Sequence, residues 1–199
     1  METRLGKVFV LIILFLIGAP LVSVLDKKRS RKIYGILLVG ACAAVCCITL
    51  ISRYGYGDRT AQLVPFYTYT EALNALPLNI APYLKDGKLI LRERLLAFSY
   101  SFQHIGLNVL LFVPFGYLLK ILFGNKKGTW IILRGMFFSL LIECIQYTFC
   151  LGWFDIDDII NNTLGTCIGC LWCMVTNWLL VKVKALPIRK DQRNRDRRI

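Results

Sequence analysis

The sequence predicts an all-α protein, a polytopic membrane helix bundle with about five transmembrane helices. The chain has 199 residues, of which 56% are hydrophobic, and its mean hydropathy of +0.56 is high for a globular domain. The basic residues, which give a formal net charge of +13, stand between and after the apolar runs. There are five such runs, each near the ~20 residues that a helix needs to cross the bilayer, at positions 8–25, 33–52, 105–123, 130–151 and 159–181.

The five runs differ in the residues that interrupt them. The first contains Pro20 and follows basic residues, as a secretory signal peptide would, but no small-residue cleavage site follows, and we expect a retained span. The second is uniformly apolar. The third contains Pro114, which is expected to kink its helix. The fourth carries Arg134 near one end, where its side chain can reach the headgroups, and the fifth carries polar residues and glycines.

The positions of Lys and Arg predict the orientation of the chain. Five spans place the 26–32 loop, the 124–129 loop and the 182–199 tail on one side, where most basic residues of the connections lie. The positive-inside rule makes this side cytoplasmic and the N-terminus external. Three parts follow, namely an additional helix with a basic cytoplasmic loop (1–32), a four-helix membrane domain with an external loop at 53–104 (33–181), and a basic cytoplasmic tail (182–199).

The composition also bears on partners and cofactors. Basic residues beside apolar spans favour contact with anionic membrane lipids over a nucleic-acid role. Most of the eight Cys lie inside the apolar runs, where Cys is ordinarily a packing residue. Cys167, Cys170 and Cys173 would fan around a helix rather than converge on a metal, and we expect no cofactor.

The external loop contains one local helix signal. Thr68 and Glu71 have the spacing of a capping box, which predicts a short helix that ends before Pro77. Aromatic residues around this helix suit a segment that lies at the membrane interface.

Polar and small residues form a stripe on each of the last two spans. A hairpin that turns at Phe154 would place Gln146 level with Asn162, and Glu143 opposite Gly165. Small residues let membrane helices approach closely, and polar side chains bond across the seam. Each stripe falls within an arc of about 80°. The stripe on the fourth span comprises Gly135, Ser139, Glu143, Gln146 and Cys150. The stripe on the fifth span comprises Asp155, Asp158, Asn162, Gly165 and Gly169.

Glu143 is the centre of the candidate site, because a carboxylate inside a span is costly and is by default a functional hypothesis. The expected helix-packing residues are Ser139, Gly165 and Gly169. The alternative is structural, with Asp155 and Asp158 as helix-capping acids and the two amides as interhelical contacts. In the functional interpretation the residues that bind substrate are Asn108, Glu143, Gln146, Asp155, Asp158 and Asn162, and Glu143 is the candidate catalytic residue.

Several blocks in order resemble one family. They are residues 63–66, 108–116, 139–146, 154–158 and 162–169, and over about 33–180 the chain resembles the VanZ-like family of bacterial membrane proteins. The chain departs from the family pattern before Phe154, where a basic residue is usual, so Arg92 or Arg94 is a candidate substitute. The resemblance implies a bacterial plasma membrane protein, and it implies a link to glycopeptide resistance, since the founding member is associated with resistance to teicoplanin.

Three functions follow as alternatives. The first is an envelope protein that lowers susceptibility to glycopeptide and lipoglycopeptide antibiotics by altering the cell surface or by binding a lipid-linked wall component. The partners would be membrane lipids and either a lipid-linked peptidoglycan precursor or a lipoglycopeptide. The second is an intramembrane enzyme on a lipid or lipid-linked substrate, with Glu143 as acid or base and with Asp155 and Asp158 able to hold a divalent cation. The third is proton-coupled transport through the buried carboxylate.

Overall fold

The predicted all-α membrane bundle is confirmed by the computed structural model, which describes residues 2–25, 27–51, 59–76, 88–124 and 128–185. Residues 77–87 of the expected external loop and residues 186–199 of the expected cytoplasmic tail lie outside the described residues. The elements are α1 (Glu2–Val22), α2 (Lys27–Cys46), a π-helical turn η1 (Cys47–Ile51), β1 (Ala61–Gln62), α3 (Tyr67–Ala75), α4 (Lys88–Leu122), α5 (Gly128–Thr148), β2 (Phe154–Asp155) and α6 (Ile156–Ala185).

Four described segments are long and apolar enough to cross a membrane: Lys27–Leu50, Leu91–Leu122, Gly128–Thr148 and Ile156–Val183. The first helix contributes a shorter apolar stretch, Phe9–Val22. Long apolar helices satisfy every backbone hydrogen bond within one segment, which is what the hydrocarbon core demands. The chain is therefore a membrane protein with four to five spans.

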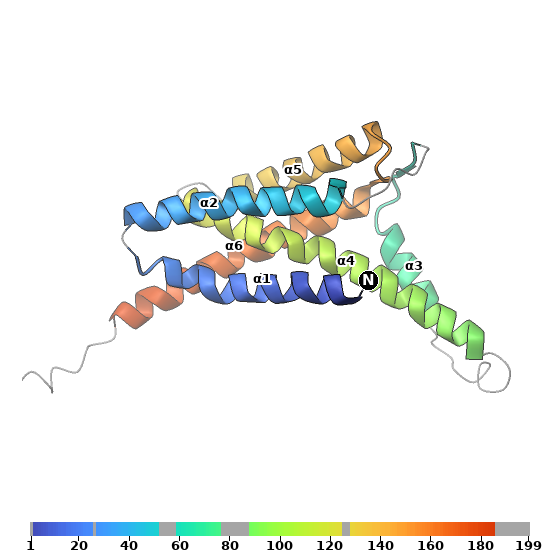
Figure 1. Cartoon of the computed structure of the whole chain (residues 1–199), viewed down its shortest axis with the longest axis horizontal. Coiled ribbons are helices and arrows are strands. Elements are labelled where there is room, and N and C mark those ends of the chain that lie inside the picture. The colour runs from blue at the N-terminus through green and yellow to red at the C-terminus, as the bar shows by residue number, and fades with distance from the viewer. Residues whose placement is uncertain (1, 26, 52–58, 77–87, 125–127, 186–199) are drawn as a thin grey trace, which may run out of the picture.

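The bundle has two distinct ends (Figure 1). At one end α3, the β1–β2 pair and the beginning of α6 gather, and this is called the α3 end below. At the other end α2 begins and α6 ends. We call this the basic end, because the first residues of α2 include Lys27, Lys28, Arg31 and Lys32. Helix α4 extends beyond the bundle at the α3 end, so residues 88–104, which we expected to be loop, are helical and approach α3.

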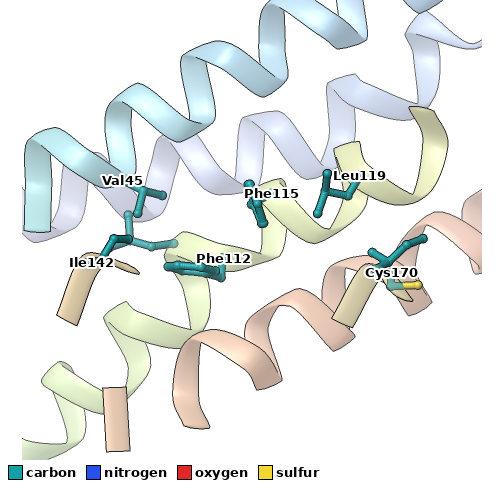
Figure 2. Packing of buried hydrophobic residues seen from close by; sticks show 8 residues of the cluster. Val45, Phe112, Phe115, Leu119, Ile142 and Cys170 are labelled. Carbon is teal, nitrogen blue, oxygen red and sulfur yellow. The ribbon is translucent and has the colours of Figure 1, made fainter. Parts of the chain in front are cut away.

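Helix α4 forms the centre of the bundle and packs against α2, α3, α5, α6 and α1. Its aromatic residues supply the middle of the core, where Phe115 stacks on Phe138 of α5 with ring centroids 5.0 Å apart. Figure 2 shows Phe112, Phe115 and Leu119 of α4 among side chains from three other helices, namely Val45, Ile142 and Cys170.

Three glycines bring α4 and α6 into backbone contact. A Cβ at Gly165 would lie 2.1 Å from the Val109 carbonyl oxygen, and one at Gly169 would lie 2.1 Å from that of Val113. From the other side, a Cβ at Gly116 would lie 2.2 Å from the Thr166 carbonyl oxygen. No larger residue fits at these positions without displacing a helix, so the glycines set the separation of the two helices.

Proline and aromatic residues fix α1 to its neighbours. Pro20 has no N–H, so the carbonyl of Leu16 loses its partner within the helix. The indole Nε1 of Trp172 donates to that carbonyl at 3.3 Å. The hydroxyl of Tyr34 in α2 donates to the carbonyl of Ala19 at 2.8 Å, near the end of α1 where carbonyls also lack helical partners.

Candidate functional site

Buried polar side chains concentrate at the α3 end, in the space between α3, α4, α5 and α6. We call this set the polar cluster. It is unusual for a membrane protein because polar groups withdrawn from water must find partners inside the protein. Its members, each at most 6% exposed, are Asn108, Ser139, Glu143, Gln146, Asp157, Asp158, Asn161 and Asn162.

Asp157 of α6 caps the N-terminus of α3, although the two are far apart in sequence. Its Oδ1 accepts from the Phe66 N–H at 2.5 Å and its Oδ2 accepts from the Thr68 N–H at 2.8 Å. The predicted short helix is thus present, but its first-turn amides are satisfied by a carboxylate of α6 rather than by a local side chain, since the N-cap residue Phe66 makes no side-chain cap. The capping-box prediction for Thr68 and Glu71 was wrong on this point.

Tyr69 ties the next turn of α3 to α6. Its hydroxyl donates to the Asn161 Oδ1, one helical turn after Asp157. Burial, and after it the nearby charge of Asp157, raises the pKa of the Tyr69 phenol above its ordinary value of 10.0. The phenol therefore stays protonated and remains a donor in this contact.

Asp158 lies on the neighbouring face of α6 and contacts α4. The Nδ2 of Asn108 donates to the Asp158 Oδ1. The Nδ1 of His104, one turn earlier on α4, lies 3.7 Å from the same oxygen. The His104 side chain is 31% exposed, whereas that of Asp158 is 5% exposed.

Glu143 lies beneath the connection between α5 and α6. Its side chain is 1% exposed, and its Oε2 accepts from the Asp155 N–H at 2.9 Å. The Asp155 carboxylate in turn accepts from the Asp157 N–H at 2.8 Å, as an N-cap does. One turn along α5, the Nε2 of Gln146 donates to the Thr49 carbonyl in η1 at 2.9 Å.

Asn162 connects α6 to α5 in the middle of the bundle. Its Nδ2 donates to the Ser139 Oγ at 2.8 Å. Three buried amide atoms of the cluster have no hydrogen-bond partner among the described residues, namely the Gln146 Oε1, the Asn161 Nδ2 and the Asn162 Oδ1. An unsatisfied buried polar atom costs ~1–3 kcal/mol, so such atoms mark a place where a ligand or water can be bound.

The predicted register of the α5–α6 hairpin was wrong. Asn162 meets Ser139 rather than Gln146, and Gly165 faces Val109 of α4 rather than Glu143. Helix α5 ends earlier than expected, because the Leu151 N–H bonds to the Gln146 carbonyl and Cys150 is left-handed with φ 54°. This is a Schellman ending, and it moves the turn toward the N-terminus.

The other predicted residues fall in different places. Asp155 and Asp158, the pair considered for a cation, use their carboxylates on different partners, the Asp157 amide and the Asn108 amide. In the part of the chain that the structure describes, no three His, Cys, Asp or Glu side chains group as metal ligands do. Arg92 and Arg94 are exposed on the extension of α4.

Three residues of the site were not identified from the sequence: Asp157, Asn161 and Tyr69. Asp157 and Asn161 are four residues apart and form a second polar face of α6, about 100° from the face that carries Asp158 and Asn162. This spacing was the available signal. The partner of this face is the segment that contains β1 and α3. Strand β1 pairs in parallel with β2, and the Thr60 carbonyl accepts from the Phe154 N–H at 3.0 Å.

Comparison with known proteins identifies the family. Protein VanZ of Enterococcus faecium is 33% identical over 95 residues, which cover 46% of this chain and 49% of that protein. The chain is thus aligned with about half the length of this curated relative. No solved structure matches the chain. A family model described as VanZ/LLP1 matches residues 8–179, which include the apolar stretch of the first helix and every residue of the polar cluster. The chain therefore belongs to the VanZ/LLP1 family of membrane proteins.

Proposed function

We propose that this protein lowers the susceptibility of a bacterium to teicoplanin-type lipoglycopeptides, acting from the plasma membrane with its α3 end facing outward. Family membership carries the proposed process. The charge distribution supports the orientation, because Lys27, Lys28, Arg31 and Lys32 gather at the opposite end, where the positive-inside rule places the cytoplasm.

The polar cluster is the proposed binding site. Its amide atoms without partners would be satisfied by a ligand with several hydrogen-bonding groups. Its carboxylates make it complementary to a donor-rich or cationic group rather than to a phosphate. Both a lipid-linked wall component and a lipid-tailed glycopeptide present such groups at the membrane surface.

An apolar groove beside the cluster supports a lipid-bearing ligand. The groove has a volume of about 300 Å³ and includes Phe154, whose neighbour Asp155 binds Glu143 through its N–H. A ligand could therefore place a hydrocarbon chain in the groove while its polar part reaches the strand pair. The groove is lined by Ala61, Leu63, Cys144, Tyr147, Thr148 and Phe154.

Glu143→Gln tests the site within the intact protein. The full chain and the variant are expressed in a susceptible host, and inhibitory concentrations are measured for teicoplanin and for a glycopeptide without an acyl chain. We expect the wild type to raise the teicoplanin value selectively and the variant to lose this effect, because Gln keeps the size of Glu143 but removes its charge.

Glu93→Gln is the matched control, since Glu93 is an exposed residue on the extension of α4. This variant should behave as wild type. Membrane levels of every variant are compared by quantitative immunoblot. An unchanged susceptibility with wild-type protein would overturn the proposed function. A fully active Glu143→Gln variant would instead overturn the polar cluster as its site.

A further inference from the structure

Three shallow hollows follow one another along α2, beginning at the basic end, and we call them together the groove. Each shares one lining residue with the next. Lys32 belongs to the first and second hollows, and Ile36 belongs to the second and third. Their volumes are about 480, 460 and 520 Å³, respectively.

The third hollow lies between α1 and α2, which both pack on α4. Leu111 and Pro114 of α4 form part of its lining, and Leu11, Ile12 and Phe15 of α1 line one wall. The α2 wall combines three small residues with larger apolar ones, and Ile48 of η1 extends it. The lining residues on α2 are Gly40, Ala41, Ala44, Ile36, Leu37 and Val45.

Glycine keeps the groove open. A Cβ at Gly35 or at Gly40 would meet nothing within 4 Å. These glycines therefore do not serve contact between helices, in contrast to Gly165 and Gly169. Beside them Ile36 and Val39 are 73% and 70% exposed, so the groove has an apolar rim as well.

The dimensions fit one hydrocarbon chain. The stretch from Ile36 to Ile48 on a helix rises about 18 Å, comparable with the ~15 Å depth of one leaflet of a ~30 Å hydrocarbon core. An apolar groove that opens sideways into a bilayer is filled by hydrocarbon, because water there would have few polar partners.

The charge at the start of the groove defines the headgroup. The first hollow is lined, among the described residues, by Lys27, Lys28, Arg31 and Lys32 alone. All four are exposed. Four neighbouring cations are complementary to a phosphate with a net negative charge, and basic clusters next to membrane spans attract anionic lipids.

We propose that this groove is a binding site for an anionic phospholipid of the leaflet at the basic end. The phosphate lies among Lys27, Lys28, Arg31 and Lys32, and one acyl chain lies along α2 past Gly35 and Gly40 toward Ile48. The site lies at the opposite end of the bundle from the polar cluster and is independent of the proposed function.

Native mass spectrometry of the full chain tests the proposal. Protein purified in mild detergent is mixed with equal amounts of phosphatidylglycerol and phosphatidylcholine that carry the same acyl chains. We expect the anionic lipid to be retained with at least about tenfold preference, since each Lys or Arg near an anionic headgroup contributes to binding. Replacing Lys27, Lys28, Arg31 and Lys32 together by Gln should remove the preference.

Two single substitutions separate the headgroup from the chain. Lys32→Gln should reduce the preference, whereas the control Lys182→Gln should not, because Lys182 lies near the same end but stacks over Trp178 outside the groove. Gly40→Leu should reduce retention of both lipids, because a Cβ at this position meets no protein atom within 4 Å and the longer side chain extends into the groove.

Each result bears on the proposal. Equal retention of the two lipids by the wild type, or an unchanged preference in the fourfold variant, would show that there is no headgroup site. Unchanged retention in Gly40→Leu would show that the groove holds no acyl chain and would overturn the proposed site. Melting temperatures measured without added lipid confirm that Lys32→Gln and Gly40→Leu, both at exposed positions, are folded.

Discussion

Asp157 accepts two backbone N–H groups at the beginning of α3, a role that a residue next to the helix usually performs. Charge-assisted hydrogen bonds of this kind contribute ~1.5–3 kcal/mol each. They offset the cost of Phe66, which is left-handed with φ 62° although it has a bulky side chain. The position of α3 thus depends on a residue of the last span.

Asp157→Asn should loosen α3 while the spans stay folded. The amide keeps one acceptor oxygen but loses the negative charge and the second acceptor, so we expect a local loss of ~1–3 kcal/mol. Hydrogen exchange of residues 66–76 measures it directly, and exchange in this segment should accelerate by about tenfold or more.

Glu71→Gln is the control for the same helix. Glu71 is exposed and is the residue that the sequence pattern assigned to a capping box, so the two interpretations differ in outcome. The structure requires unchanged exchange in this variant. If exchange accelerated in Glu71→Gln and stayed unchanged in Asp157→Asn, the local capping box would be supported and the cap from α6 contradicted.

Individual residues of the cluster were predictable when they were polar and lay within an apolar run. Glu143, Asn108 and Asn162 stand out on this criterion alone, and all three are buried. Asp157 and Tyr69 were not predictable in this way. Their partners lie 89 or more positions away in sequence. Such contacts depend on where the segment with β1 and α3 packs rather than on local spacing.

Helices α4 and α6 approach each other closely at their glycines, and this approach sets their separation. Gly116→Ala should destabilise the protein by ~1–3 kcal/mol, because its Cβ would lie 2.2 Å from the Thr166 carbonyl oxygen and would force α4 and α6 apart. Thermal unfolding in detergent, followed by circular dichroism, measures the change.

Gly106→Ala on the same helix is the matched control. A Cβ at Gly106 meets nothing within 4 Å, and Ala in a helix interior is favoured over Gly by ~0.5–1 kcal/mol. The melting temperature of Gly106→Ala should therefore equal or exceed that of the wild type. A similar fall in both variants would mean that loss of glycine itself, and not the helix contact, causes the effect.

Cysteine crosslinking distinguishes the observed α5–α6 register from the predicted one. In a chain whose eight native Cys are replaced, a pair at positions 139 and 162 should form a disulfide, since Ser139 and Asn162 are in hydrogen-bond contact. A pair at 143 and 165 should remain reduced, because Gly165 faces α4. The reverse preference, seen by gel mobility under oxidising conditions, would reinstate the hairpin that turns at Phe154.

The spans and α3 followed from the sequence, but the ends of the spans, η1 and the β1–β2 pair did not. Apolar runs of about twenty residues located the spans because the bilayer fixes that length. Cys150 carries no signal for a left-handed C-terminal residue, a position usually held by Gly, so the end of α5 and the register that follows from it were misplaced.

At the scale of the whole molecule, the two ends of the bundle differ in charge, and this difference predicts the topology. A single Cys at exposed position 71, in α3, should react with a membrane-impermeant maleimide added to intact cells. A single Cys at exposed position 28, at the basic end, should react only after permeabilisation. Labelling with the opposite pattern would invert the orientation and place the polar cluster on the cytoplasmic side.

The cap on α3 has a consequence for how the protein is made. Phe66 and Asp157 are 91 positions apart, so at ~5–20 residues per second a ribosome needs about 5 to 18 s to deliver the carboxylate after the amide. During this interval α3 has no cap from α6. A chain that lacks its last helix therefore leaves α3 without this anchor. Asp157 thereby makes the position of α3 depend on completion of the chain.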